Sequence, residues 1–419
     1  MKKKTVKTIA SAMVFAFGMS IVPAPAFAVS TNVVAETEGK NTLTLSEIQE
    51  LAVLYNDTVD SLELNIKQIE LQERTTEKQR RQAQRSLDDI DSTSVDEDLD
   101  GNGEVTDFEK EFAAEMNSAS NAAADAMFEQ TSAQIDQLDD ALDQIADGKK
   151  DLQQALEDLE HIMRYTSAQL ALSIVQLTDS VELMEKQIAL IDKSIAVYEL
   201  QEQLGMATTI SVDAQHTSKV EAENQLRDTK EQLDNLKRSL NQLIGRPVNN
   251  PLEVVPMELT GVIDPAPKFT QELINEFVKV NPQMVSLLED REDLKDSAKG
   301  NKEQSEKEDI EYQIQAKDME LKKQRQAAED DLKAMIATIE KNAVNYRVSK
   351  EKLATEQKNF AIAQKKYELG MISQMQLMQN EMALAQAELT NLSNGYQHYF
   401  DWQQFKLARQ GIDVSAMGK

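Results

Sequence analysis

The stretch that decides the fold is Tyr367-Glu-Leu-Gly370-Met-Ile-Ser373, which stands between two long helical patterns. Gly370 can take the left-handed backbone conformation that ends a helix. Ser373 and Gln376 have the spacing of a capping box, in which two side chains satisfy backbone N–H groups at the start of the next helix. The chain is therefore predicted to reverse direction here, between two antiparallel helices.

Apolar residues follow this turn at alternating spacings of four and three, the period of a coiled-coil seam. They are Met371, Met375, Met378, Met382, Ala385, Leu389, Leu392, Tyr396 and Tyr399. The same spacing leads into an earlier turn, Leu204-Gly205-Met206-Ala-Thr208, through Leu177, Val181, Met184, Ile188, Ile191, Ile195 and Tyr198. Both turns are therefore predicted to be the tips of helical hairpins.

The two hairpins belong to an internal duplication. Gly245 follows Gly205 after 40 residues, and Gly411 follows Gly370 after 41 residues, so the returning arms match in length. A short leading helix also occurs twice, because the segment 269–282 echoes the segment 43–56.

The composition fits long helices better than a thick globular core. The 419 residues include only 13 Gly, eight Pro and 5% aromatic residues, and cysteine is absent, which excludes disulfides. We therefore expect an all-α fold of long antiparallel coiled-coil helical hairpins in two internal repeats, with little or no β-structure. The net charge of −28 disfavours nucleic acid and anionic lipid as partners.

These patterns divide the chain into six segments. They are a signal peptide at 1–28, a disordered segment at 29–42, a first repeat at 43–248, a linker at 249–267, a second repeat at 268–412 and a tail at 413–419. A cleaved secretory signal is indicated by the N-terminal lysines, the apolar run after them and Ala26-Phe-Ala28. A membrane anchor is the alternative, but Pro23 and Pro25 interrupt the apolar run that it would need. Within the first repeat, the long helix could break near 117–121 and 147–148.

The first repeat also contains an acidic loop at 88–109, whose last 12 residues resemble the calcium loop of the EF-hand family. The expected Ca²⁺ ligands are Asp98, Asp100, Asn102, the carbonyl of Glu104, Thr106 directly or through water, and Glu109. An acidic loop that matches by chance is the alternative. Gly103 and Val105 favour calcium, because acidity alone would not produce them, whereas the weak preceding helix and the missing second loop count against a complete EF-hand.

The duplicated order of leading helix, long helix, Leu-Gly-Met-x-(Thr/Ser) turn and returning helix resembles the TolC-type outer-membrane efflux family. The resemblance covers roughly residues 43–411, and only the turns are specific. It implies a homotrimer whose hairpins form a tunnel for exported molecules. It also implies two partners, a periplasmic adaptor (membrane fusion) protein that meets the hairpin tips and an inner-membrane transporter.

Two sets of tip residues are the partner-binding candidates that this resemblance implies. They are Leu204, Gly205, Met206 and Thr208 at the first turn, and Leu369, Gly370, Met371 and Ser373 at the second. Helix capping alone would also explain the same Gly and Ser residues, and both interpretations stay open at this point.

The sequence departs from the family where membrane-embedded strands are inserted before each long helix. Neither insertion point has alternating apolar segments rich in aromatic residues and Gly. In the first repeat Gly205 follows Asn56 after 149 residues, and in the second repeat Gly370 follows Asn281 after 89 residues. The 60 additional residues of the first repeat are predicted to be helix and acidic loop. We therefore expect a divergent member that is exported to the cell envelope or beyond it, and is in an outer membrane only if such strands are present after all.

An enzyme is not expected. The three histidines have no evident partner, and no phosphate loop or nucleophile elbow occurs. Two classes of function are left: a component of an envelope export or efflux system, and a secreted coiled-coil structural or adhesive protein that calcium could stabilise. A closed trimer that binds an adaptor would distinguish the first class from the second.

Overall fold

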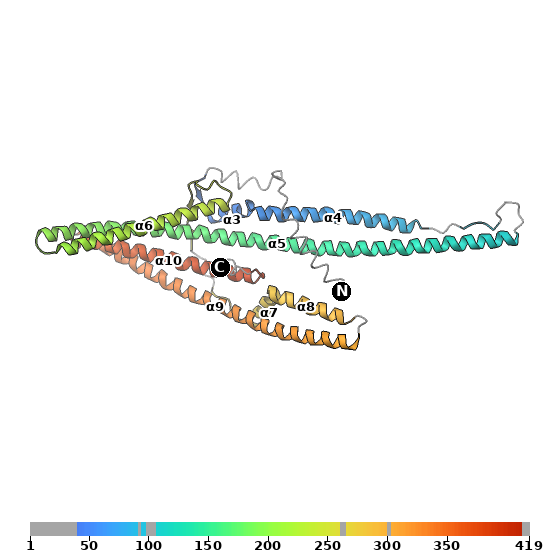
Figure 1. Cartoon of the computed structure of the whole chain (residues 1–419). Coiled ribbons are helices and arrows are strands. Elements are labelled where there is room, and N and C mark those ends of the chain that lie inside the picture. The colour runs from blue at the N-terminus through green and yellow to red at the C-terminus, as the bar shows by residue number, and fades with distance from the viewer. Residues whose placement is uncertain (1–39, 91–93, 98–105, 260–264, 300–302, 413–419) are drawn as a thin grey trace. The chain divides into compact units, whose positions relative to one another are not determined.

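The computed structural model describes residues 40–90, 94–97, 106–259, 265–299 and 303–412 (Figure 1). These residues are mostly helical, and the strands among them, β1 (Thr42–Leu43) and β2 (Glu253–Val254), pair in parallel with Thr42 opposite Glu253. The described residues form two compact units: a first unit of residues 57–160, and a second unit of residues 40–56 and 161–412. The predicted all-α fold of long hairpins is confirmed.

The helices repeat in order and partly in length. The first repeat contains α3 (Leu45–Leu54), α4 (Asp57–Asp88), α5 (Asp107–Gln203) and α6 (Thr209–Leu243); the second contains α7 (Gln271–Val280), α8 (Pro282–Ala298), α9 (Gln304–Glu368) and α10 (Gln374–Ala408). Helices α3 and α7 have 10 residues each, and α6 and α10 have 35 each. Helix α4 has 32 residues against 17 in α8, and α5 has 97 against 65 in α9. The extra helical length of the first repeat therefore lies in α4 and α5.

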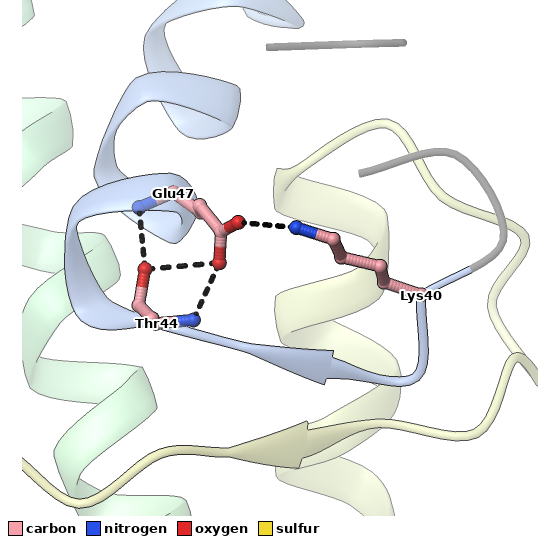
Figure 2. A network of polar contacts seen from close by, with 3 residues as sticks. All are labelled: Lys40, Thr44 and Glu47. Carbon is pink, nitrogen blue, oxygen red and sulfur yellow. Dashed lines mark hydrogen bonds and ion pairs between the residues drawn. The ribbon is translucent and has the colours of Figure 1, made fainter. Parts of the chain in front are cut away.

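Helix α3 begins at a capping box, as Figure 2 shows. The Thr44 N–H donates to Glu47 Oε2 at 2.8 Å, and the Glu47 N–H donates to Thr44 Oγ1 at 3.3 Å. Lys40 Nζ adds a bond to Glu47 Oε1 at 3.0 Å. The backbone hydrogen bond from Thr44 lowers the pKa of Glu47 despite the opposing effect of burial. The side chains of Thr44 and Glu47 thus accept hydrogen bonds from N–H groups that the first turn of a helix cannot satisfy itself, and Lys40 holds the Glu47 carboxylate in place.

In the second unit, α5 and α6 form an antiparallel hairpin (Figure 1). Lys230 Nζ lies 2.6 Å from Glu185, and Lys219 Nζ lies 2.7 Å from Asp192, so the residue numbers run in opposite directions along the two helices. The buried residues between them include Val181, Leu233, Leu240 and Ile244. The predicted apolar positions of α5 are buried or half-buried from Leu177 to Tyr198.

Helices α9 and α10 form the second antiparallel hairpin. Leu332, Ile336 and Ile339 pack with Phe405. Asn342 Nδ2 donates to Asp401 Oδ2 at 2.6 Å across the same pair of helices. The predicted apolar positions of α10 are buried or half-buried. Met371 is the exception, because it lies in the turn before α10 and is exposed.

The two repeats meet where α5 packs against α10, a contact that we call the repeat joint. Its apolar part contains Leu172 and Val175 of α5 and Tyr396 of α10, and burial raises the pKa of Tyr396 to about 12. Lys186 Nζ lies 3.6 Å from Glu381 Oε1 in the same contact.

Burial also raises the pKa of Asp179 on α5, and the negative charges of Glu182 and Glu388 add to this effect. Because Glu388 belongs to α10, the second repeat contributes to the environment of a carboxyl group in the first. The repeat joint is therefore an electrostatic contact as well as an apolar one.

In the first unit, α4 runs antiparallel to α5. Arg80 forms a bidentate ion pair with Asp139, and Lys149 Nζ lies 2.9 Å from Glu73 Oε2. Helix α5 is continuous through 117–121 and 147–148, so the breaks expected there are wrong. Asn117 instead uses its side chain to hold the segment before α5: its Oδ1 accepts from the Val95 N–H at 2.6 Å, and its Nδ2 donates to the Val95 carbonyl at 3.2 Å.

Two further findings concern segments outside the long hairpins. The linker predicted at 249–267 contributes β2 to the strand pair. No helix within the described ranges combines the length and the apolar character that a membrane span requires. The expected signal peptide at 1–28 lies outside the described residues.

Candidate functional site

The candidate site consists of the two hairpin tips, which have the same backbone structure. At the first tip, the Gly205 N–H donates to the Glu202 carbonyl at 2.8 Å and the Met206 N–H donates to the Gln201 carbonyl at 2.7 Å. This pair of bonds is the Schellman motif, which ends a helix by satisfying its last carbonyl groups. The second tip repeats it, with Gly370 bonded to Tyr367 at 2.9 Å and Met371 bonded to Lys366 at 2.8 Å.

Glycine is favoured at these turns for a backbone reason. Gly205 and Gly370 have φ angles of 70° and 71°, a region that strains any residue with a Cβ atom. Gly245 and Gly411 end α6 and α10 in the same way, at φ angles of 69° and 87°. The spacings of 40 and 41 residues in the sequence thus correspond to the distance between one Schellman motif and the next.

A polar cap starts each returning helix immediately after the turn. Thr208 caps α6 and accepts from the Ser211 N–H at 3.3 Å. Ser373 caps α10 in the predicted capping box, since the Ser373 N–H donates to Gln376 Oε1 at 2.9 Å and the Gln376 N–H donates to Ser373 Oγ at 3.2 Å. The predicted capping role of Ser373 is therefore confirmed, and Thr208 has the same role at the first tip.

Apolar side chains are exposed on both tips. The exposed fractions are 65% for Leu204, 75% for Met206, 74% for Leu369 and 68% for Met371. Capping does not need large apolar groups at these positions, and burial of one such side chain in an interface would contribute about 1.5–3 kcal/mol. The tips are consequently suited to contact with another apolar surface.

The structure places each predicted set of four residues together at one tip. Sequence reasoning missed Ile210, which is 79% exposed in the first turn of α6. Its position in the sequence could have indicated this exposure. Ile210 lies only two residues after the Thr208 cap, in the first turn of α6, before the helix packs against α5.

A concave region lies elsewhere in the second unit, where α7, α8, α9 and α10 line a cavity that is open to solvent. Its buried carboxylate, Asp401, accepts hydrogen bonds from Asn342 and, at 3.0 Å, from Gln397. These bonds satisfy both carboxylate oxygens, so Asp401 serves the packing of α9 against α10.

The predicted calcium loop falls mainly outside the described residues, as do four of its ligands, Asp98, Asp100, Asn102 and Glu104. Thr106 directly precedes α5, and Glu109 belongs to the first turn of that helix. Among the described residues, no group of three or more His, Asp or Glu is arranged to hold a metal ion.

No protein-family model matches the sequence, and no curated protein sequence matches it. Solved structures are similar to it. A crystal structure of CusC, studied for its folding and transmembrane channel formation, superposes with a TM-score of 0.51 at 13% identity over 88% of this chain and 96% of CusC. The fold is TolC-like.

Two outer-membrane proteins also match at lower scores. The outer membrane channel CmeC of Campylobacter jejuni has a TM-score of 0.46 and 10% identity, over 95% of each chain. The outer membrane protein VceC of Vibrio cholerae has a TM-score of 0.44 and 11% identity, over 88% of this chain and 97% of VceC.

Proposed function

We propose that this chain is a component of an envelope export or efflux system, and that it contributes helical hairpins to a tunnel. The observation that carries this proposal is the pair of matched hairpins, each with a Schellman turn and exposed apolar residues at its tip. The fold supports the proposal, because CusC, with which the chain shares it, is described as forming a transmembrane channel. The chain would act after export into the cell envelope.

The tips would dock a periplasmic adaptor of the membrane fusion type, which in turn would contact an inner-membrane transporter. Leu204, Met206, Leu369 and Met371 would supply apolar contact. Gly205 and Gly370 would keep the turns narrow, and the Thr208 and Ser373 caps would fix the direction of the returning helices. Docking would remove apolar surface from water without requiring the tips to fold.

We further propose that the functional form is a homotrimer. One chain supplies two hairpins, and a closed tunnel needs further hairpins beside them. Helix α9 offers a surface for this contact, since Val344, Val348 and Ile362 share one face of the helix and are exposed. A second copy of the chain could cover this face.

The test measures oligomeric state and adaptor binding on the full chain. Light scattering should give a trimer, and Val348→Asp should shift it toward monomer, whereas Val220→Asp on α6 should not. Leu369→Ser/Met371→Ser should weaken binding of a co-expressed adaptor by about tenfold or more. The control Leu64→Ser/Leu71→Ser removes two exposed leucines of α4 and should leave binding unchanged. A monomer that binds no adaptor would refute the proposal.

A secreted coiled-coil structural or adhesive protein is the second candidate, and the enlarged first unit favours it. Helices α4 and α5 are held there by ion pairs such as Arg80 with Asp139, which fits a stiff surface rod. Under this alternative the chain would bind no adaptor, and the tip substitutions would change nothing but stability.

We also propose that the loop before α5 binds Ca²⁺ through Asp98, Asp100, Asn102, Glu104, Thr106 and Glu109. Support comes from the sequence spacing and from the helix that begins at Asp107, two residues before the twelfth position. Isothermal titration should show Ca²⁺ binding that Glu109→Ala abolishes and that Glu111→Ala, two residues further along the helix, preserves. Equal heats for the wild type and Glu109→Ala would end this proposal.

A further inference from the structure

The first turns of α5 carry an apolar face in the first unit that no other described residue covers. Phe108, Phe112 and Met116 are exposed, and the rings of Phe108 and Phe112 stack at a centroid distance of 6.2 Å. Ala119, Ala123 and Met127 continue the same face and are also exposed. We call these six residues the α5 strip.

Helical geometry places the α5 strip on one side of the helix. At about 100° per residue, its spacings of four, four, three, four and four keep the six side chains within about 100° of one another. Ala113 and Ile135 lie on a different side, about a third of a turn away, where they are buried. The α5 strip is therefore separate from the face that packs within the first unit, and it runs for about 29 Å.

Acidic side chains border the α5 strip. Glu111, Glu115 and Glu129 share the edge of this face and are exposed, and none of the three forms an ion pair with another described residue. Their environment is strongly acidic. Residues 57–160 contain 29 Asp and Glu against nine Lys and Arg, a formal charge of −20 out of −28 for the whole chain.

This charge discriminates among the surfaces that could cover the α5 strip. A second copy of the same region would bring two such negative charges together, and an anionic lipid surface would be repelled as well. A partner that is both cationic and apolar would instead gain from burial and from charge. We propose that the α5 strip binds a basic amphipathic helix, with Lys and Arg beside an apolar face.

In the complex, the apolar face of the partner helix covers Phe108, Phe112 and Met116. Its basic side chains lie beside Glu111, Glu115 and Glu129. This is recognition of an amphipathic helix by an apolar surface, here with an acidic edge that selects the sign of the partner's charge. The proposal does not depend on the export function, because it uses only residues of the first unit.

The experiment measures fluorescence anisotropy of labelled synthetic peptides with the full chain, in EDTA so that the calcium loop has no influence. The probe is a Leu/Lys peptide of about 18 residues, which spans about 27 Å as a helix. Phe108→Ser/Phe112→Ser/Met116→Ser should weaken its binding by about tenfold or more. Glu111→Gln/Glu115→Gln/Glu129→Gln should weaken it by about three- to tenfold and should reduce its dependence on salt.

Controls separate this surface from general attraction to an acidic protein. Leu64→Ser/Leu71→Ser should bind like the wild type, and circular dichroism should show unchanged helicity in every variant. A scrambled Leu/Lys peptide without an apolar face should bind at least about tenfold more weakly. The same peptide with Glu in place of Lys should not bind.

Several results would overturn the proposal. One is equal binding by the wild type and the Phe108/Phe112/Met116 variant, and another is equal binding of the ordered and the scrambled peptide. If this variant loses binding to phosphatidylglycerol vesicles but not to the peptide, the α5 strip meets lipid. If it loses only self-association in sedimentation, the α5 strip meets a second copy.

Discussion

Alanine substitutions at the four left-handed glycines should have unequal costs, although all four glycines end helices in the same way. At Gly205 and Gly370 an added Cβ meets no atom within 4 Å, so the backbone conformation alone is penalised. That penalty is about 1–2 kcal/mol. At Gly411 the added Cβ would lie 2.6 Å from the Val280 carbonyl oxygen, and at Gly245 it would lie 2.3 Å from Tyr55 Cγ.

The clash at Gly411 involves backbone, so α7 must shift to relieve it. Overpacking of this kind costs about 1–3 kcal/mol, which gives a total of about 2–5 kcal/mol for Gly411→Ala when the left-handed penalty is added. The expected order of destabilisation is thus Gly411→Ala and Gly245→Ala above Gly205→Ala and Gly370→Ala. Gly370→Asn should recover most of the loss at the tip, because Asn tolerates the left-handed region.

Urea titrations followed by far-ultraviolet circular dichroism would measure these differences, with the midpoint and slope compared for each variant. Equal losses at all four sites would refute the packing argument. A neutral Gly370→Ala would refute the assignment of a left-handed turn. Adaptor binding by Gly370→Asn would then distinguish the role of Gly370 in ending the helix from a role in contact with the adaptor. This variant keeps the turn but changes the surface of the tip.

Three further predictions concern other parts of the chain. Glu47→Ala should lower the free energy of unfolding by about 0.5–2 kcal/mol at neutral pH. Because the hydrogen bond from the cap's backbone N–H lowers the pKa of Glu47, urea titrations should show the full loss above the unfolded-state pKa of about 4.3 and less as pH falls through the folded-state pKa. For Asp179, burial and two neighbouring glutamates raise the pKa. The ionised carboxylate therefore destabilises the folded state, and this destabilisation is absent below the unfolded-state pKa of about 3.9 and complete above the folded-state pKa. Asp179→Asn should therefore raise the melting temperature at neutral pH and not in acid, and a melting temperature that is unchanged at both pH values would contradict this. Asn117→Ala, which removes two hydrogen bonds to Val95, should destabilise the start of α5 by about 1–2 kcal/mol, seen as faster hydrogen exchange there than in an Asn121→Ala control.

Local features of this fold could be predicted from sequence because each depends on residues a few positions apart. Gly205 and Gly370 end helices through their own backbone conformation, and Ser373 and Gln376 form their capping box within one turn. The apolar positions of α10 follow from helical periodicity in the same way. The exception, Met371, has the correct spacing but precedes the first turn of the helix, where no neighbour covers it.

Features that depend on distant residues could not be predicted. The continuity of α5 past Asn117 and Gly148 is one case, because both residues disfavour a helix locally. Contacts with another part of the first unit outweigh this preference: Asn117 bonds to Val95, and Lys149, beside the glycine, pairs with Glu73. The pairing of β1 with β2 and the repeat joint are likewise long-range contacts.

The same distinction between local and long-range features applies to the candidate site. The spacing of Gly and Thr at the first tip, and of Gly and Ser at the second, located both tips, and these residues end one helix and start the next. The exposure of Leu204, Leu369 and Ile210 became visible only in three dimensions, because apolar residues beside a turn can as well be buried by a neighbouring helix. The α5 strip is a similar case, since its spacing alone would have predicted a packed helix.

The repeat joint has a consequence for the order in which the chain can fold as it is synthesised. Helix α10 follows all the other described helices in synthesis, yet its Tyr396 and Phe400 cover Leu172 and Tyr165 of α5. Until α10 arrives, the first repeat can close its own hairpin but leaves these α5 residues in water. A nascent chain therefore exposes this surface until the synthesis of α10 is complete, and a chain cut before α10 exposes it permanently to proteases.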